Sequence, residues 1–309
     1  MSYAIASFRG SDGPHPALVL DGQIFPLAGL RQRCAPGPTL GPEASVAAML
    51  GNWSGETGAL DALAAVAAQR LAAGTLDMTG VDAATLAAPF RPARIFCAAS
   101  NYIEHANEMG TVLAAKAQSR PYMFLKTFSS VIGPEETVII PPETQQADWE
   151  VELAAVIGRR ARRISPEQAL DHVAGYTVVN DVSARDLTRR TDYPFKHDWF
   201  QGKNHDTFCP LGPWIVPARF IPDPQTLKLR LSVNDTLMQD GTTADMIWTT
   251  AEQISYLSSI VTLQPGDVIA TGTPTGVGMG RGVYLAPGDV MTAWVEGIGT
   301  LRNPVAAEE

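Results

Sequence analysis

The feature that most constrains the fold is a segment in which two carboxylates begin a strongly apolar run, Asp148-Trp149-Glu150-Val151-Glu152-Leu153-Ala154-Ala155-Val156-Ile157-Gly158. The run from Val151 onward predicts a buried strand. Residues two apart in a strand share a face, so Glu150 and Glu152 point the same way and Val151 points into the opposite layer. Because neighbouring carboxylates repel each other and are costly to desolvate, the fold has to bring a partner to them.

A third carboxylate is predicted at the end of a neighbouring strand. The β-branched run Gly175-Tyr176-Thr177-Val178-Val179-Asn180 is followed directly by Asp181. Three carboxylates that converge would offer only oxygen ligands, which suit Mg²⁺, Mn²⁺ or Ca²⁺. The alternative is an exposed edge strand with solvated glutamates and an aspartate that caps a turn. The spacing alone leaves both interpretations open.

Composition narrows the class of protein. The chain has 309 residues, of which 45% are hydrophobic and 18% charged, and this is enough apolar material for a substantial core. The net charge of −9 argues against nucleic-acid and membrane partners. No apolar run approaches the roughly 20 residues of a membrane span, and we expect no signal peptide. Three cysteines without a Cys-x-x-Cys pair are typical of reduced thiols, so we expect a cytoplasmic protein.

The pattern changes along the chain near residue 92. Residues 1–91 predict a small α/β domain, with a hairpin turn at Asp21-Gly22 and a helix from about Thr57. Residues 92–309 are rich in short β-like runs bounded by glycine and proline, with helical patterns at 166–173 and 248–260. The sequence therefore predicts an α+β protein of two domains.

Basic groups with a chemical interpretation occur at three places. His105 and Glu108 are i,i+3 neighbours if their segment is helical, and a carboxylate beside an imidazole orients it as a general base requires. A surface ion pair is the alternative. Lys126 ends an apolar run and Lys203 lies in a polar segment. Each lysine could bind an anionic substrate or simply extend into solvent.

A glycine-rich loop over residues 270–282 suggests a nucleotide site only superficially. It lacks the Gly-x-Gly-x-x-Gly spacing, and no Gly-Lys-Ser/Thr follows it. A loop that approaches a ligand closely, or an array of β-turns, fits the pattern better.

Taken together, these segments resemble the fumarylacetoacetate hydrolase family. The motifs that carry the resemblance occur in family order between about residues 92 and 305. They are Asn101-Tyr102-x-x-His105-x-x-Glu108, Phe124-Leu125-Lys126, Glu150-Val151-Glu152-Leu153, Gly175-Tyr176-Thr177, Asn180-Asp181-Val182-Ser183-Ala184-Arg185-Asp186, Gly202-Lys203, Pro210-Leu211-Gly212-Pro213, Gln264-Pro265-Gly266-Asp267 and Thr271-Gly272-Thr273-Pro274.

The resemblance implies a mixed β-roll or sandwich catalytic domain, a homodimer and a divalent metal, Mg²⁺ or Mn²⁺ with Ca²⁺ as a further candidate. The site residues that it implies fall into three groups. The metal ligands are Glu150, Glu152 and Asp181; the catalytic groups are His105, Glu108 and Lys203, the first two on a lid; the substrate-binding groups are Lys126, Arg185, Thr273 and Thr188. Thr188 is a departure, since many relatives carry glutamine there, and this leaves substrate identity open.

The resemblance also implies an activity. We expect hydrolysis of a C–C bond in a 2,4-diketo acid that resembles an acylpyruvate or fumarylpyruvate, by a water that His105 and Glu108 activate, with an enolate stabilised by the metal. A 2-oxo acid decarboxylase or a hydroxy-diene-dioate isomerase on the same scaffold is the alternative. A non-catalytic metal-binding scaffold is a more remote one.

Overall fold

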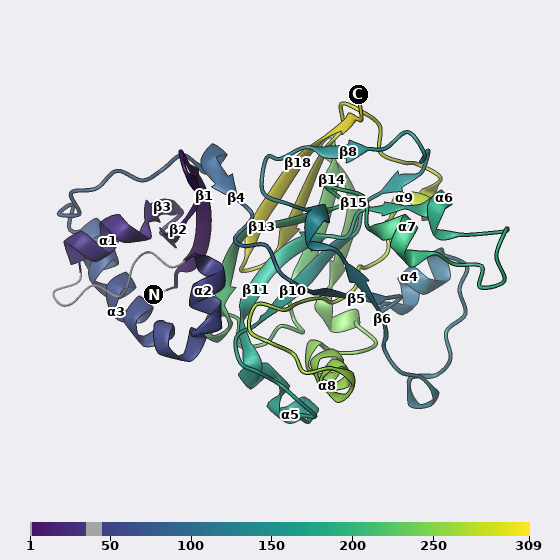
Figure 1. Cartoon of the computed structure of the whole chain (residues 1–309), viewed down its shortest axis with the longest axis horizontal. Helices are drawn as coiled ribbons and strands as arrows, with labels where there is room; N and C mark the ends of the chain where they lie inside the picture. The colour runs from purple at the N-terminus through teal and green to yellow at the C-terminus, as the bar shows by residue number, and fades with distance from the viewer. Residues whose placement is uncertain (1, 35–44) are drawn as a thin grey trace.

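The computed structural model describes residues 2–34 and 45–309, and most of their strands belong to one large mixed sheet (Figure 1). The order along its main path is β3-β2-β1-β13-β11-β10-β16-β5-β6, while β4 pairs with β1 and β7 with β13. The bounds of its strands are β1 Ala4–Gly10, β2 Gly13–Leu20, β3 Gln23–Pro26, β4 Leu86–Ala87, β5 Ile95–Ala99, β6 Tyr122–Lys126, β7 Val131–Ile132, β10 Val151–Ile157, β11 Val173–Asn180, β13 Cys209–Pro217 and β16 Val268–Ala270.

A second sheet, in the order β15-β14-β17-β18-β8, packs over β10, β11 and β13. Its strands are β8 Val138–Ile140, β14 Lys228–Val233, β15 Thr236–Thr242, β17 Val290–Val295 and β18 Gly299–Ala307; a separate pair consists of β9 Ala147–Asp148 and β12 Ser183–Ala184. The main core lies between the two sheets, where Val151 and Leu153 of β10 join Leu231 and Ala293 in one buried apolar cluster. The second sheet therefore covers one face of β10 and leaves the other face to the site.

The helices are mostly short, and four of them border the site. Their bounds are α1 Leu27–Cys34, α2 Val46–Gly51, α3 Trp53–Ala72, α4 Ile103–Glu108, α5 Pro166–Ala169, α6 Arg185–Thr188, α7 Trp199–Lys203, α8 Thr250–Ile260 and α9 Gly278–Arg281. Figure 1 shows α4, α6, α7 and α9 together on the side of the molecule away from the N-terminal strands. Helix α8 begins with a capping box between Thr249 and Glu252.

The N-terminal strands extend the large sheet. The hairpin between β2 and β3 turns at Asp21-Gly22, as predicted, where both residues have positive φ. Strand β1 pairs with β13 at Ile5↔Ile215, so residues on both sides of the predicted boundary near residue 92 share one sheet. Helix α3 begins at Trp53, one turn earlier than predicted. The boundary itself stays a prediction.

The prediction of an α+β fold with a mixed β-roll is confirmed. The strand predicted from Val151 onward is β10, and the β-branched run from Gly175 to Asn180 lies within β11 and ends with it. The helical pattern at 166–173 forms α5 and a following 3₁₀ turn that ends at His172. Among the described residues, no helix combines the length and apolar character needed to cross a membrane.

Candidate active site

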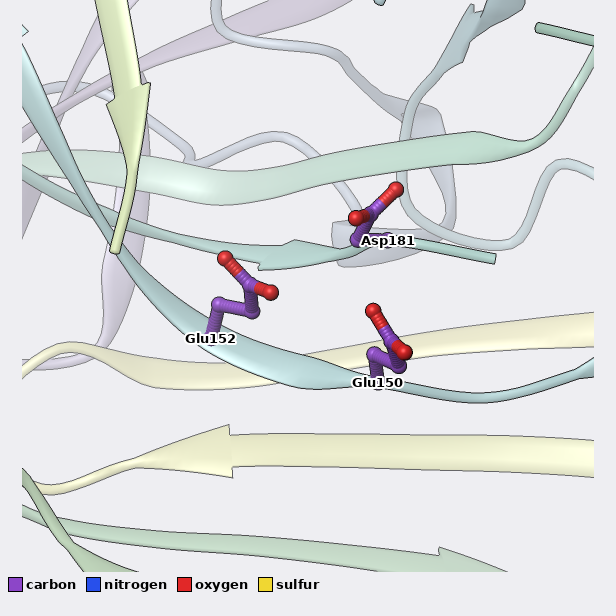
Figure 2. A group of neighbouring side chains, drawn as sticks. All are labelled: Glu150, Glu152 and Asp181. Atoms are coloured by element: carbon purple, nitrogen blue, oxygen red, sulfur yellow. The ribbon is translucent and has the colours of Figure 1, made fainter. Parts of the chain in front are cut away.

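The start of strand β10 presents two carboxylates to the same side. Glu150 and Glu152 are 5% and 1% exposed, and Val151 between them is buried in the core on the opposite face. Figure 2 shows both glutamates rising from one strand toward Asp181. The alternation predicted from the sequence thus places two charges where a strand normally buries apolar side chains.

The third carboxylate arrives through antiparallel pairing of β10 with β11. Val151 lies opposite Asn180, the last residue of β11, and the next residue, Asp181, donates its backbone N–H to the carbonyl of Glu150 at 2.9 Å. One oxygen from each of the three carboxylates lies within 4.8 Å of the others. Burial, together with the charges of Asp181 and Glu150, raises the pKa of Glu152 well above its ordinary value. Three converging carboxylates offer oxygen donors, which a hard divalent cation prefers.

Three basic side chains contact this cluster. The Nζ of Lys203 lies 2.7 Å from both Glu150 Oε2 and Asp181 Oδ2, and Lys126 Nζ lies 2.6 Å from Asp181 Oδ1. Arg185 Nη2 lies 2.6 Å from Glu150 Oε1. Burial acts to raise the pKa of Glu150, but Arg185 and Lys203 outweigh it and the pKa falls well below its ordinary value. Glu150 is therefore held ionised.

Arg185 is held in turn by Asp148, a residue that the sequence reasoning did not single out. Asp148 is fully buried, and its Oδ2 accepts from Arg185 Nε at 2.8 Å. It also accepts from the backbone N–H groups of Gly278 at 2.6 Å and Met279 at 3.0 Å. The one available signal was that Asp148 opens the same segment as Glu150.

The predicted His105–Glu108 pair lies on α4. His105 is buried, and its Nδ1 is 3.5 Å from Glu108 Oε2, a long separation for a hydrogen bond. Burial acts to raise the pKa of Glu108, but hydrogen bonds from His105, the Gly276 backbone and Thr275 lower it overall. An ionised Glu108 facing Nδ1 orients the ring and leaves Nε2 as the nitrogen that can exchange a proton.

The glycine-rich loop binds carboxylates of the protein itself. Gly272 donates its N–H to Glu152 at 2.8 Å, and Gly276 donates to both oxygens of Glu108 at 3.1 Å. Gly276 has φ +102°, and a Cβ there would lie 2.2 Å from the carbonyl oxygen of Met238, so only glycine fits. Thr273 donates its hydroxyl to the carbonyl of Val151 at 2.8 Å. One loop therefore positions both a candidate metal ligand and the orienting acid of the histidine.

A cavity of about 390 Å³ opens above these groups. Seven predicted site residues line it: His105, Glu150, Glu152, Arg185, Thr188, Lys203 and Thr273. The other three are not among the lining residues: Glu108 contacts His105, Asp181 contacts Lys203, and Lys126 contacts Asp181. The Thr188 hydroxyl donates to the carbonyl of Ala184 at 3.0 Å.

Five further residues line the same cavity: Arg120, Arg189, His197, Trp199 and Trp248. Two of these, His197 and Trp199, belong to the segment 192–200 between Asp181 and Lys203, whose mixture of aromatic and basic residues predicts either a contact with the far end of a substrate or an ordinary surface loop. Arg120 and Trp248 come from segments whose sequence gives no comparable indication.

Comparisons with known proteins agree with the motifs. A profile of the family described as "Fumarylacetoacetate (FAA) hydrolase C-terminal" matches residues 94–306. The chain is 45% identical to a 2,4-didehydro-3-deoxy-L-rhamnonate hydrolase of Sphingomonas sp. (strain SKA58) over 209 residues, which are 67% of this chain and 70% of the relative. It is 40% identical to a mitochondrial oxaloacetate tautomerase of Homo sapiens over 247 residues, 79% of this chain and 76% of the relative.

A solved structure of similar fold carries a metal. The maleylpyruvate hydrolase from Sphingobium sp. SYK-6, in complex with manganese(II) ion and pyruvate, superposes with a TM-score of 0.73 at 28% identity and covers 99% of this chain and 100% of its own. The profile match spans more than half of the chain, and the sequence identities of 45% and 40% extend over more than two thirds of each relative. The chain belongs to the fumarylacetoacetate hydrolase family.

Proposed function

We propose that this protein is a divalent-metal-dependent hydrolase that cleaves a C–C bond in a 2,4-diketo acid of the acylpyruvate type. The observation that carries the proposal is that Glu150, Glu152 and His105 line one cavity, with Asp181 and Glu108 directly behind them. A buried cation site and an oriented imidazole are the two groups that such a hydrolysis needs.

The residues that would hold the cation are Glu150, Glu152 and Asp181, with Mg²⁺ and Mn²⁺ as the best-suited ions. When bound, the cation supplies Lewis acidity toward the 2-oxo acid group of the substrate. Lys203 and Arg185 also line the cavity beside Glu150, and they add fixed positive charge where an anionic substrate has to enter.

The protein's own residues account for the proton transfers. His105, oriented by Glu108, takes a proton from a water whose oxygen bonds to the distal carbonyl carbon of the substrate. The bond between that carbon and its neighbour then breaks, and its electron pair stays on the pyruvyl fragment. The imidazolium returns the proton to that fragment. The products are pyruvate and a carboxylic acid, so atoms and charges balance.

A second candidate, keto–enol tautomerisation of oxaloacetate, is favoured by the 40% identity to a protein of that name. It needs the same cation site and a proton carrier but no attacking water. The two candidates differ in products, because tautomerisation releases no pyruvate. Decarboxylation and diene-dioate isomerisation are separated from hydrolysis by the same product analysis.

The test follows the ultraviolet absorbance of several 2,4-diketo acids and of enol oxaloacetate with the purified protein. Each substrate is run with Mg²⁺, with Mn²⁺ and with excess chelator, and the products are identified. Chelator-sensitive release of pyruvate plus a carboxylic acid supports the hydrolase. Loss of the enol absorbance of oxaloacetate without cleavage of any diketo acid overturns it in favour of the tautomerase.

We also propose that the protein is a homodimer and lies in the cytoplasm. Strand β6 lies at the end of the large sheet, and Leu125 on it is 53% exposed. Nearby Phe128 and Phe200 are 60% and 70% exposed, and such an apolar edge is suited to a second copy of the chain. Sedimentation velocity over a range of protein concentrations tests the assembly, and a constant monomer would reject it.

A further inference from the structure

Strand β15, at the end of the second sheet, buries a polar side chain and exposes an apolar one. Among the described residues of β15, Gln239 alone is buried, with no exposed surface, whereas Leu237 two positions earlier is 49% exposed. Burying an amide is unfavourable unless its N–H groups and its oxygen find hydrogen-bond partners. The place of Gln239 in the fold is therefore explained by what it contacts.

The partners of Gln239 belong to the strand and the loop that carry the candidate site. Its Oε1 accepts from the backbone N–H of Val151 at 3.0 Å, so the amide oxygen faces strand β10. Its Nε2 donates to Thr273 Oγ1 at 2.8 Å and to the carbonyl of Pro274 at 2.9 Å, which uses both N–H groups. One side chain of the second sheet thus joins β10 to the glycine-rich loop.

These contacts close a ring of hydrogen bonds around the backbone of Val151. The Thr273 hydroxyl, which accepts from Gln239, donates in turn to the carbonyl of Val151 at 2.8 Å. A backbone N–H can only donate and a carbonyl can only accept, so the amide orientation and the direction of the hydroxyl proton are both fixed. Val151 lies between Glu150 and Glu152, and the ring therefore holds the backbone from which both carboxylates project (Figure 2).

The loop at the other side of the ring holds two carboxylates of the site. Gly272 donates its N–H to Glu152 at 2.8 Å, and Gly276 donates its N–H to both oxygens of Glu108 at 3.1 Å. The two residues that Gln239 contacts lie between these glycines in the chain. A shift of the loop away from β10 would withdraw one donor from a candidate metal ligand and the other from the acid that orients the imidazole.

The loop also lies directly against the backbone of β15 on both sides of Gln239. A Cβ at Gly276 would lie 2.2 Å from the carbonyl oxygen of Met238. A Cβ at Gly241 would lie 2.5 Å from the Cβ of Pro274. These approaches are possible because neither glycine carries a Cβ, and they leave the Gln239 amide as the polar contact in the middle of the interface.

We propose that Gln239 is a positioning residue of the site. Its amide sets the spacing between β10 and the glycine-rich loop, and thereby the placement of Glu152 and Glu108. The inference rests on the proposed function only for the use that the site makes of these two carboxylates. The competing role is stability alone, through satisfaction of buried backbone groups. The two roles differ in whether loss of the amide weakens metal binding in a protein that is still folded.

The test compares two glutamines that bridge segments through their amides. Gln239→Met removes the amide and keeps a side chain of similar length, and Gln225→Met is the matched control. Gln225 Nε2 donates to the carbonyl of Thr243 at 3.0 Å, and its Oε1 accepts from the N–H of Thr250 at 2.8 Å. These partners belong to neither β10 nor the glycine-rich loop, so both variants lose stability but only Gln239→Met loses a contact to the site. Denaturant unfolding measures the two losses of stability.

Two measurements that need no turnover follow the site. Isothermal titration with Mn²⁺ alone measures metal affinity, and Gln239→Met should bind the ion about tenfold more weakly than the wild type. Hydrogen exchange in chelator, read by mass spectrometry on peptides covering 270–278, measures the protection of the Gly272 and Gly276 N–H groups. Exchange there should be about tenfold faster in Gln239→Met. Gln225→Met should stay close to the wild type in both measurements.

Variants of Thr273 test the same ring and leave Gln239 in place. Thr273→Ser keeps the hydroxyl and should retain Mn²⁺ affinity. Thr273→Val keeps the shape without the hydroxyl and should weaken Mn²⁺ binding as Gln239→Met does. In the double variant of Gln239→Met and Thr273→Val the two losses should not add, because each change breaks the same ring. The Thr273 variants decide the question if Gln239→Met does not fold.

Unchanged Mn²⁺ affinity and unchanged exchange in Gln239→Met would show that Gln239 serves stability alone and would overturn the inference. Equal losses in Thr273→Ser and Thr273→Val, or additive losses in the double variant, would overturn it as well. If metal affinity and exchange follow the ring while no 2,4-diketo acid is cleaved, the inference stands and the proposed function fails. If the wild type binds no Mn²⁺, the proposed function fails, and the exchange measurement in chelator still decides the inference.

Discussion

At the floor of the cavity, which Glu150, Glu152 and His105 line, the charged groups are buried, and each touches an opposite charge or a backbone donor. At the mouth, by contrast, Arg120 and Arg189 are exposed, and no described residue is an ion-pair partner for either. Glu150, Glu152 and Asp181 are contacted by Lys126, Lys203, Arg185 and the glycine-rich loop. Arg120 and Arg189 are attached only through the segments that carry them. The charged groups of the floor are thus part of the protein's internal network of ion pairs and hydrogen bonds, and the two arginines of the mouth are not.

The difference has an energetic cause. A buried charge without a partner costs several kcal/mol, so one change on the floor disturbs both the site and the fold. An exposed charge keeps its hydration, so a change at the mouth alters recognition with little effect on stability. The chemistry is therefore expected to be hard to vary, and the specificity easy to vary.

The largest effect is expected from Glu150→Gln. The substitution removes the negative charge that Arg185 and Lys203 contact and replaces one of the three candidate ligand carboxylates with a neutral amide, so metal-dependent turnover should fall to the limit of detection. Calorimetric titration with Mn²⁺ and a turnover assay measure the two losses. Glu143→Gln, at an exposed glutamate, is the control; unchanged metal affinity in Glu150→Gln would contradict the ligand assignment.

His105→Ala separates chemistry from metal binding on the same floor. Loss of a general base should lower turnover by about 10²- to 10⁴-fold, while Mn²⁺ affinity stays within a few-fold of the wild type because the three carboxylates remain. The same two assays apply. A collapse of metal affinity would show that His105 itself contacts the ion.

Glu152→Gln tests whether the floor trades stability for function. Burial and the neighbouring Asp181 and Glu150 raise the pKa of Glu152, so its ionised form is unfavourable without a cation. In chelator the variant should unfold at a higher temperature, with a gain of about 0.5–2 kcal/mol, and Mn²⁺ should no longer raise its Tm. A variant less stable than the wild type in chelator would argue against repulsion at this position.

Glu108, at the end of α4, is expected to make the free energy of unfolding depend on pH. Burial acts to raise the pKa of Glu108, but the hydrogen bonds from His105 and the Gly276 backbone lower it overall. The pKa of Glu108 in the folded protein therefore lies below its value of about 4.3 in the unfolded chain. Its contribution to stability is complete above that unfolded value and is lost as pH falls through the folded one. Glu108→Gln should be less stable than the wild type near pH 7, and the difference should close toward pH 3. Urea unfolding across this range checks the sign, and a constant difference would refute it.

The smallest effect is expected at the mouth. Arg120→Gln and Arg189→Gln remove charges that no described residue pairs with, so each should change the free energy of unfolding by less than about 0.5 kcal/mol. Denaturant unfolding of these variants beside Arg190→Gln, which loses the contacts to Asp192 and Asp198, sharpens the comparison. A large loss in the first two would show that the mouth, too, is part of the stabilising network.

The floor was predictable where local periodicity decided it. Alternation along β10 put Glu150 and Glu152 on one face and Val151 on the other, and this holds whatever the strand pairs with. The i,i+3 spacing likewise brought His105 and Glu108 together once α4 formed. The family motifs supplied the remaining candidate site residues, and the structure places Arg185, Lys203 and Thr273 among the residues that line the cavity.

What failed to show in the sequence depended on contacts between distant segments. Asp148 holds Arg185 across 37 positions and meets the loop near Gly278 across 130, and no local pattern encodes either contact. The glycine-rich loop was expected to approach a ligand or form turns, but its backbone N–H groups bind Glu152 and Glu108. A backbone donor has no sequence signature, because every residue except proline carries one.

The sequence by itself therefore determined which side chains share a face and which carboxylates are candidates for a cation site, because the first follows from strand and helix periodicity and the second from the cost of burying charge. The tertiary structure decided that Asp181 lies beside Glu150, since that depends on antiparallel pairing of β10 with β11. It also decided which cations are used inside the fold and which, like Arg120 and Arg189, face the cavity. Strand pairing and side-chain packing bring together segments that are far apart in the chain, so only the folded structure fixes the distances between their side chains.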